Sequence, residues 1–159
     1  MSVAFTREED VEAAAANIPD RPISPHPNLV TPQGLAQLEE AFALAKAAYA
    51  AAQSAGDISA DRTAMARATR DLRYYGARRA SAQLVTPPPG ATHVTFGSTV
   101  TMERDDGVAQ TYRIVGEDEA DPKLGSVSYV SPLARSLLGK EVGDSVQVAG
   151  RAVEVLDIR

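Results

Sequence analysis

The chain has 159 residues and a net charge of −5, which argues against a general nucleic-acid binder. It contains no cysteine, which excludes disulfides, thiolate metal sites and cysteine nucleophiles. No apolar run approaches the roughly 20 residues that span a bilayer. The acidic stretch from Met1 to Asp20 also lacks the apolar core of a signal peptide, so we expect a cytoplasmic protein.

Residues 1–29 are predicted to form an acidic, proline-rich tail. Four acidic residues precede an alanine cluster at 13–16, a pattern typical of a short helix with acids in its first turn. Four prolines then fall within nine residues, from Pro19 to Pro27, which predicts an extended or turning segment. His26 has no metal-ligand partner at suitable spacing, so we expect no metal site there.

Residues 30–86 are predicted to form an antiparallel coiled-coil hairpin. Seam positions repeat at alternating spacings of three and four in both arms, as the a and d positions of a coiled coil do. These positions are Leu35, Leu38, Phe42, Ala45, Tyr49 and Ala52, then Met65, Ala68, Leu72, Tyr75, Arg79 and Ala82. Thr31 followed by Pro32 favours a helix start, and the second arm is predicted to run to Val85, before the prolines at 87–89.

The predicted tip of the hairpin carries two carboxylates four residues apart, Asp57 and Asp61. Asp57 or Ser59 would cap the second helix, and Asp61 would complement the helix dipole in its first turn. Arms of about 20 residues would place this tip on the order of 30 Å from the base of the hairpin. From spacing alone, capping accounts for both acids.

The second arm is rich in arginine, with six arginines and two aspartates between residues 60 and 83. One interpretation is a solvated helix face, and the other is a binding surface for an acidic or phosphate-bearing partner. The candidate residues of this basic face are Arg67, Arg70, Arg73 and Arg78. Arg79 falls on the seam, where its stem can cover apolar surface while its guanidinium stays in water. The acidic tail has the charge needed to fold back on this face and mask it.

Residues 91–159 are predicted to form a small antiparallel β domain, which makes the chain α+β. Period-two alternation over 94–102 and a turn signal at 105–107 predict a hairpin whose second strand covers 109–115. Further strands are expected at 126–130 and in a hairpin over 143–158.

One short helix is predicted on this domain. Ser131 and Pro132 are typical of a helix start, and Gly139 of a helix end. The acidic loop at 117–121 lacks the glycine and distal glutamate of a calcium loop, so it is predicted to be solvated. The sequence holds no nucleophile motif and no phosphate-binding loop, so we expect neither an autonomous enzyme nor a small-molecule substrate.

Three stretches resemble the bacterial Gre family of transcript cleavage factors. They are TYRIVGEDEAD at 111–121, SPLARSLLGKEVGD at 131–144, and Gly56-Asp57-Ile58 at the hairpin tip. The resemblance spans residues 31–158 and is strongest in the C-terminal half. It implies a coiled coil joined to an FKBP-like domain that grips the rim of the secondary channel of RNA polymerase. The polymerase-binding residues it implies are Ser131, Pro132 and Arg135.

By this resemblance, the protein is not itself an enzyme but assists the polymerase's own cleavage of backtracked transcripts. Asp57, helped by Asp61, would hold the weakly bound second Mg²⁺ of the polymerase and orient the attacking water. The metal is thus shared with the polymerase, and no cofactor is expected in the free protein. The expected partners are RNA polymerase and the nucleic acid of the transcription complex, with no membrane.

Two departures from the family pattern favour an alternative. Ala60 stands where the family has a glutamate, and Asp61, one residue on, is turned by about 100° on a helix. Each arm is also roughly a heptad shorter, which would pull the tip back by about 10 Å. The alternative is a non-cleaving polymerase-binding regulator of the nucleoside diphosphate kinase regulator type. A third reading, a prolyl isomerase, comes only from the expected fold, and its pocket would need clustered aromatic side chains.

Overall fold

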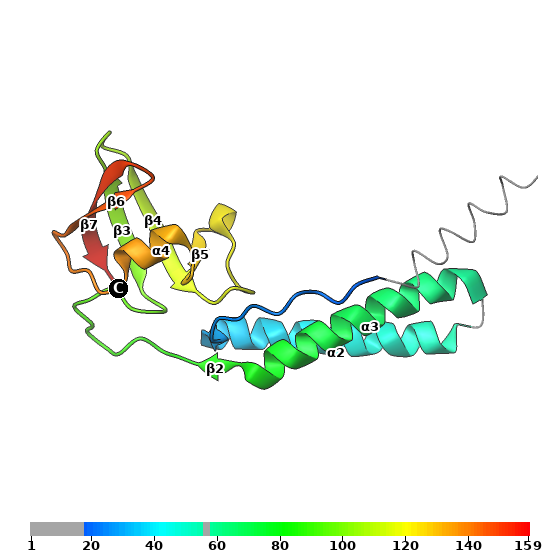
Figure 1. Ribbon diagram of the computed structural model, residues 1–159. Helices are drawn as coiled ribbons and strands as arrows, with labels where there is room; N and C mark the ends of the chain where they lie inside the picture. Colours follow the sequence, from blue (N-terminus) through cyan, green and yellow to red (C-terminus); the bar gives the residue numbers. More distant parts are fainter. Residues whose placement is uncertain (1–17, 56–57) are drawn as a thin grey trace, which may run out of the picture. The chain divides into compact units, whose positions relative to one another are not determined.

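The computed structural model describes residues 18–55 and 58–159, with the side chains of 58–61 also outside the description. The chain divides into two compact units. The hairpin unit comprises Met1–Pro25 and Gln37–Ser81, and the sheet unit comprises His26–Ala36 and Ala82–Arg159. Figure 1 traces the elements in chain order. Within the described ranges, no helix is both long and apolar enough to cross a bilayer.

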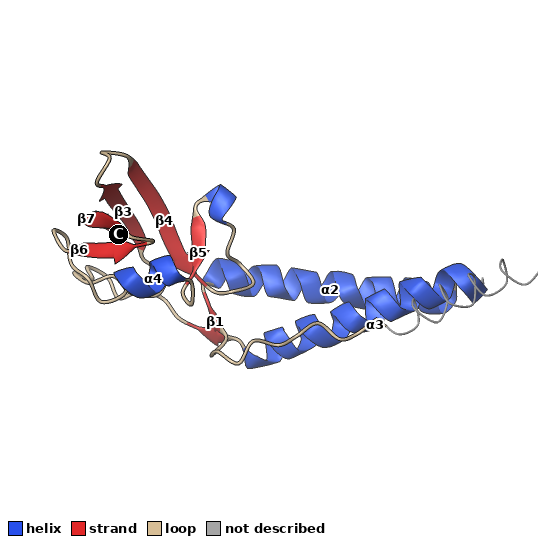
Figure 2. Ribbon diagram, turned by 45° about the horizontal axis from the view of Figure 1, so that its top comes forward, coloured by secondary structure: helices blue, strands red, loops and turns tan. Residues whose placement is uncertain are grey.

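Two long helices form the hairpin, α2 (Pro32–Ser54) and α3 (Ile58–Ser81), and they lie side by side in Figures 1 and 2. The predicted pair of packed helices is confirmed. The predicted reversal includes Gly56 and Asp57, which lie outside the described residues. Thr31 starts α2 as expected, because its side-chain oxygen accepts a hydrogen bond from the backbone N–H of Gly34 at 3.0 Å.

The predicted seam is visible in the burial of the helices. Every second member of the first repeat is buried, namely Leu38, Ala45 and Ala52, and Ala68 is buried on α3. Gly76 leaves room for an aromatic side chain of the other helix: a methyl group added at Gly76 would lie 3.3 Å from the Phe42 ring. Arg79 is exposed, with its guanidinium 5.4 Å from the centroid of the Phe42 ring.

The prediction that the second helix runs to Val85 is wrong, because α3 ends at Ser81. Two short strands, β1 (Leu29–Val30) and β2 (Gln83–Leu84), pair in parallel instead. The backbone N–H of Gln83 donates to the carbonyl of Asn28 at 2.8 Å, and that of Val85 donates to Val30 at 3.0 Å. These amides therefore bond to another segment rather than to the preceding turn of a helix.

The sheet unit contains a five-stranded sheet with the order β5-β4-β3-β7-β6. The strands are β3 (Thr99–Arg104), β4 (Ala109–Val115), β5 (Ser126–Ser128), β6 (Ser145–Val148) and β7 (Arg151–Ile158). All neighbouring strands are antiparallel except β4 and β5, which are parallel. The α+β fold class is confirmed, and the sheet is mixed rather than wholly antiparallel. A connection that crosses back through the 3-10 turn η1 (Pro122–Leu124) makes the parallel pair possible.

The core of this unit lies between the sheet and the short helix α4 (Pro132–Leu137). Ala134 and Leu137 of α4 are fully buried. Their buried neighbours are Val94, Val100, Met102, Ile114, Val127, Val146, Val153 and Val155. The predicted start of α4 is confirmed, because the Ser131 hydroxyl accepts a hydrogen bond from the backbone N–H of Ala134 at 3.2 Å. Burial of one face of α4 thus leaves Pro132 and Arg135 exposed on the other.

Glycine determines where the strands begin and turn. The predicted strand over 94–102 starts only at Thr99, because Gly97 has a φ of +87° and the Ser98 N–H closes a turn onto Thr95. The β3–β4 turn carries Gly107 with a φ of +80°. Next to it, Asp106 bonds to Arg104, and this hydrogen bond, with that from the Val108 N–H, lowers the pKa of Asp106.

Candidate functional site

The two tip carboxylates cannot be placed as a pair. Asp57 lies outside the described residues, and Asp61 lies in the first turn of α3 with its side chain also outside the description. Their role as metal-holding residues therefore remains a prediction. Among the described residues, no group of three or more His, Cys, Asp or Glu side chains is arranged to hold a metal ion.

The basic face of α3 differs from the predicted one at Arg78. Arg67 and Arg73 are exposed and Arg70 is half-buried, but Arg78 is only 2% exposed. The prediction that Arg78 belongs to the exposed basic face is therefore wrong. Arg78 follows Tyr74 by four positions and Asp71 by seven, so these three residues lie on one side of α3.

A groove of about 490 Å³ lies along α3 in the hairpin unit. Its charged lining residues are Arg62, Arg70 and Arg73, with Asp20 of the N-terminal segment. Its apolar lining includes Met65 and two alanines, Ala52 and Ala66. Cations beside apolar side chains suit a ligand that carries both negative charge and flat apolar groups.

Glu119 is a buried acid that the sequence did not reveal as important. Its side chain is only 7% exposed and accepts a hydrogen bond from the Thr31 hydroxyl at 2.6 Å. Arg113 lies 3.9 Å from the same carboxylate and donates to the Gln33 side chain at 3.3 Å. The prediction of a solvated acidic loop is thus wrong at Glu119, because this carboxylate binds the residue that caps α2.

The close approach of Gly116 brings this loop against β1. Any side chain at Gly116 would overlap the carbonyl oxygen of Leu29. The Tyr129 hydroxyl adds a further contact by donating a hydrogen bond to the carbonyl of Pro27 at 2.5 Å. The first turn of α2 and the strand before it are therefore held by the loop after β4 and by the residue after β5. In the sequence, these contacts were signalled only by Thr31 at a helix-capping position and by the acidic motif at 117–121.

Replacing Glu119 by alanine should lower the free energy of unfolding by about 1.5–3 kcal/mol, because Thr31 and Arg113 would lose a charged, mostly buried acceptor. Glu119→Gln keeps an acceptor for Thr31 and should cost less. Urea unfolding measures both, with exposed Glu154→Ala as the matched control, expected to stay within about 0.5 kcal/mol of wild type. Equal losses for Glu119→Ala and Glu154→Ala would contradict the anchoring role.

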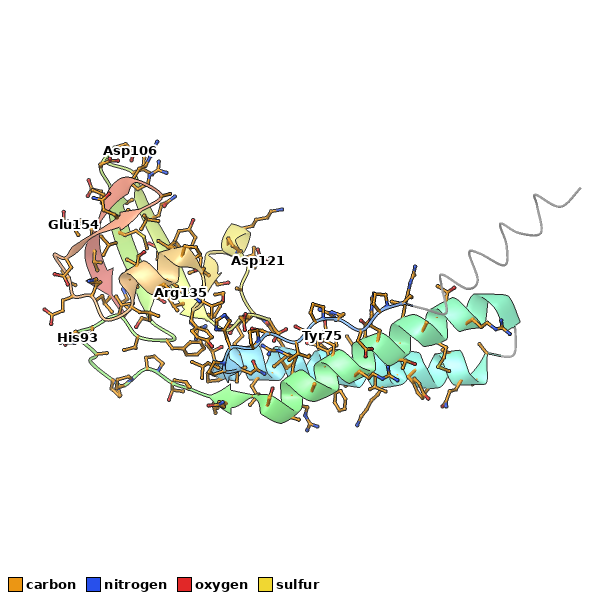
Figure 3. All side chains as sticks on the ribbon, in the orientation of Figure 1. Tyr75, His93, Asp106, Asp121, Arg135 and Glu154 are labelled. Carbon is orange, nitrogen blue, oxygen red and sulfur yellow. The ribbon has the colours of Figure 1, made fainter. Side chains whose placement is uncertain are left out.

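The predicted polymerase-binding residues come together on α4. Ser131 is the half-buried cap of this helix, while Pro132 and Arg135 are exposed (Figure 3 labels Arg135). Val130, directly before the cap, is half-buried. Burial of Ala134 and Leu137 directs Arg135 to solvent, where a planar guanidinium can bind a carboxylate on a partner.

The fold and these surfaces define an α+β protein with a hairpin of two long helices and a short capped helix that carries Arg135. Residues 89–159 match the family model described as transcription elongation factor, GreA/GreB, C-term. This part of the chain is therefore similar to the C-terminal part of GreA/GreB proteins, which agrees with the resemblance found in residues 111–121 and 131–144.

Two GreA proteins are similar to this chain in sequence, and one solved structure aligns with it at low similarity. The transcription elongation factor GreA of Hyphomonas neptunium is 51% identical over 74 residues, covering 43% of this chain and 47% of that protein. GreA of Desulfovibrio desulfuricans is 43% identical over 94 residues, covering 58% and 57% respectively. The chain thus spans about half the length of the curated relatives it matches. The structure of GreA factor homolog 1 (Gfh1) of Thermus thermophilus aligns with a TM-score of 0.40 at 20% identity, covering 84% of this chain and 99% of that one.

Proposed function

We propose that this protein is a transcription elongation factor that binds RNA polymerase at its secondary channel. The observation that carries the proposal is the GreA/GreB match of residues 89–159, which includes the capped helix α4. Exposed Arg135 and Pro132 would contact the polymerase rim, with α4 positioned by its buried Leu137. The protein would act on the polymerase's own reaction and perform no chemistry by itself.

In the first form of the proposal, the hairpin stimulates cleavage of backtracked transcripts. Asp57, helped by Asp61, would supply oxygen ligands to the second Mg²⁺ of the polymerase, because hard carboxylate oxygens suit this ion. The same carboxylates would orient a water molecule for in-line attack on the phosphodiester. The exposed arginines of α3, Arg67 and Arg73, would face nucleic acid or the acidic wall of the channel.

In the second form, the protein occupies the channel without stimulating cleavage. Ala60 supports this form, because a methyl group at that position cannot ligate a metal. Asp61 would then serve only the first turn of α3, as an acid near a helix N-terminus. Such a protein would change initiation or elongation by blocking the channel.

A cleavage assay on a stalled, backtracked transcription complex tests the proposal. Wild-type protein should accelerate RNA shortening, and Asp57→Ala should remove about 10²-fold or more of that acceleration, because loss of a metal ligand costs several kcal/mol in the transition state. The measurement is the rate of RNA shortening at saturating protein, where binding no longer limits the rate.

Arg135→Ala serves as the matched binding variant in the same assay. Its loss of activity should be recovered at high protein concentration, whereas the loss in Asp57→Ala should not. Competition with a genuine cleavage factor without any RNA shortening would reject the first form and support the second. A purified protein that neither competes nor shortens RNA would reject both forms.

A further inference from the structure

An N-terminal segment of the hairpin unit runs along α3, and we name residues 18–25 the strap (Figure 3 labels Tyr75 beside it). Arg21 anchors the strap to the helix. Its guanidinium carbon lies 3.8 Å from the centroid of the Tyr74 ring and 5.0 Å from that of Tyr75. One guanidinium nitrogen lies 3.6 Å from a carboxylate oxygen of Asp71. A side-chain hydrogen bond with Tyr75 raises the pKa of Arg21, so its cationic form is the one bound.

The backbone of the strap favours this arrangement. It contains three prolines, at positions 19, 22 and 25, which restrict the chain to extended conformations before it binds the helix. Less conformational entropy is therefore lost when the strap docks on α3. Three kinds of contact at one residue, together with a stiff backbone, make Arg21 the stable attachment point.

Asp20, the neighbour of Arg21, makes a contact of a different kind. Its carboxylate lies 3.3 Å from the guanidinium of Arg73, and the two side chains are 62% and 67% exposed. Exposed ion pairs of this kind are weak and are screened by salt. Asp20 and Arg73 also line the groove of about 490 Å³, together with Arg62 and Arg70. The strap therefore places a negative charge among the cations of the groove.

We propose that the strap masks a binding groove for single-stranded RNA on α3. In this arrangement Asp20 occupies Arg73 in place of an RNA phosphate, and Arg21 holds the strap so that Asp20 stays there. RNA phosphates displace Asp20 from Arg73, while unpaired bases contact the apolar lining residues Met65 and Ala66. The paired bases of a duplex cannot reach these side chains, which is why a single strand is the ligand. The choice of RNA rests on the proposed function.

Binding of a fluorescently labelled 12-nucleotide oligouridylate to the full chain, followed by anisotropy, tests this mask. Asp20→Asn should bind about three- to tenfold more tightly, because Arg73 gains a phosphate partner. Its plot of log affinity against log salt concentration should steepen by about 0.7, the value for one added contact to a single strand. Arg21→Ala should also bind more tightly than wild type, even though it removes a positive charge.

Two further variants make the test specific. Glu40→Gln makes the same charge change at an exposed site on α2 outside the groove lining, and its affinity should stay within about twofold of wild type. In an Arg73→Ala background, Asp20→Asn should give no gain, because the two side chains act as a pair.

Several results would contradict the proposal that the strap masks the groove. They are equal gains for Asp20→Asn and Glu40→Gln, a gain that survives Arg73→Ala, weaker binding by Arg21→Ala, or no RNA binding by any variant. The assay contains no polymerase, so such a failure leaves the cleavage and competition tests of the proposed function untouched.

Discussion

Replacing Gly116 by alanine should destabilise the sheet unit by about 3 kcal/mol or more, because the added methyl group has no room. An ideal Cβ at this position would overlap the carbonyl oxygen of Leu29, which is backbone and cannot rotate away. The strand β1 would have to move from the loop after β4, and the paired strands β1 and β2 would move with it. Urea unfolding of the full chain measures the loss.

Gly76→Ala is the matched control for this substitution. Its Cβ would lie 3.3 Å from an atom of the Phe42 ring, a side chain that can turn slightly, and alanine favours the interior of a helix by about 1 kcal/mol over glycine. We therefore expect a stability change within about 1 kcal/mol of zero for Gly76→Ala. Similar losses for the two variants would show that the contact between Gly116 and Leu29 does not constrain the fold.

Leu137→Ala should lower the free energy of unfolding by about 2–5 kcal/mol, since it leaves a cavity under α4. Leu137 is fully buried and is one of the ten buried residues that form the apolar core of the sheet unit. The m-value of urea unfolding should not change, because the surface exposed on unfolding stays nearly constant. The loss should also displace Arg135, two residues earlier on the same helix, and so weaken the proposed binding to RNA polymerase.

The adjacent Leu138 provides the comparison. It is only half-buried at the end of α4, so Leu138→Ala removes less apolar surface from the core and should cost clearly less than Leu137→Ala. A larger loss at Leu138 than at Leu137 would mean that α4 packs through a different face from the one described.

Much of the fold follows from interactions between residues close in sequence. The repeat that contains Leu38 and Ala45 predicts which face of α2 is buried, because a helix returns to the same face every three to four residues. The cap at Ser131 and the turn at Gly107 depend on a few neighbouring atoms, and both were predicted correctly. The family of residues 89–159 was also recognisable, from motifs that are contiguous in the chain.

The candidate site was predictable only in part. The motif at 131–144 located α4 and its exposed Arg135, and the arginine content of the second arm located a basic helix face. The sequence did not distinguish Arg78, which is buried, from Arg73, which is exposed. Burial of a helical side chain depends on which other parts of the chain pack around it, and helical periodicity carries no information about that packing.

The sequence by itself determined the two amphipathic helices, the capped helix α4, the hairpin turns and the family motifs, because each depends on residues within a few positions of one another. Only the tertiary structure decided the parallel pairing of β4 with β5 and of β1 with β2, the bond of Glu119 to Thr31 across 88 positions, and the docking of Arg21 on Tyr74. Each of these contacts depends on the path by which the chain returns to itself. No local sequence pattern selects that path; burial of the whole core does.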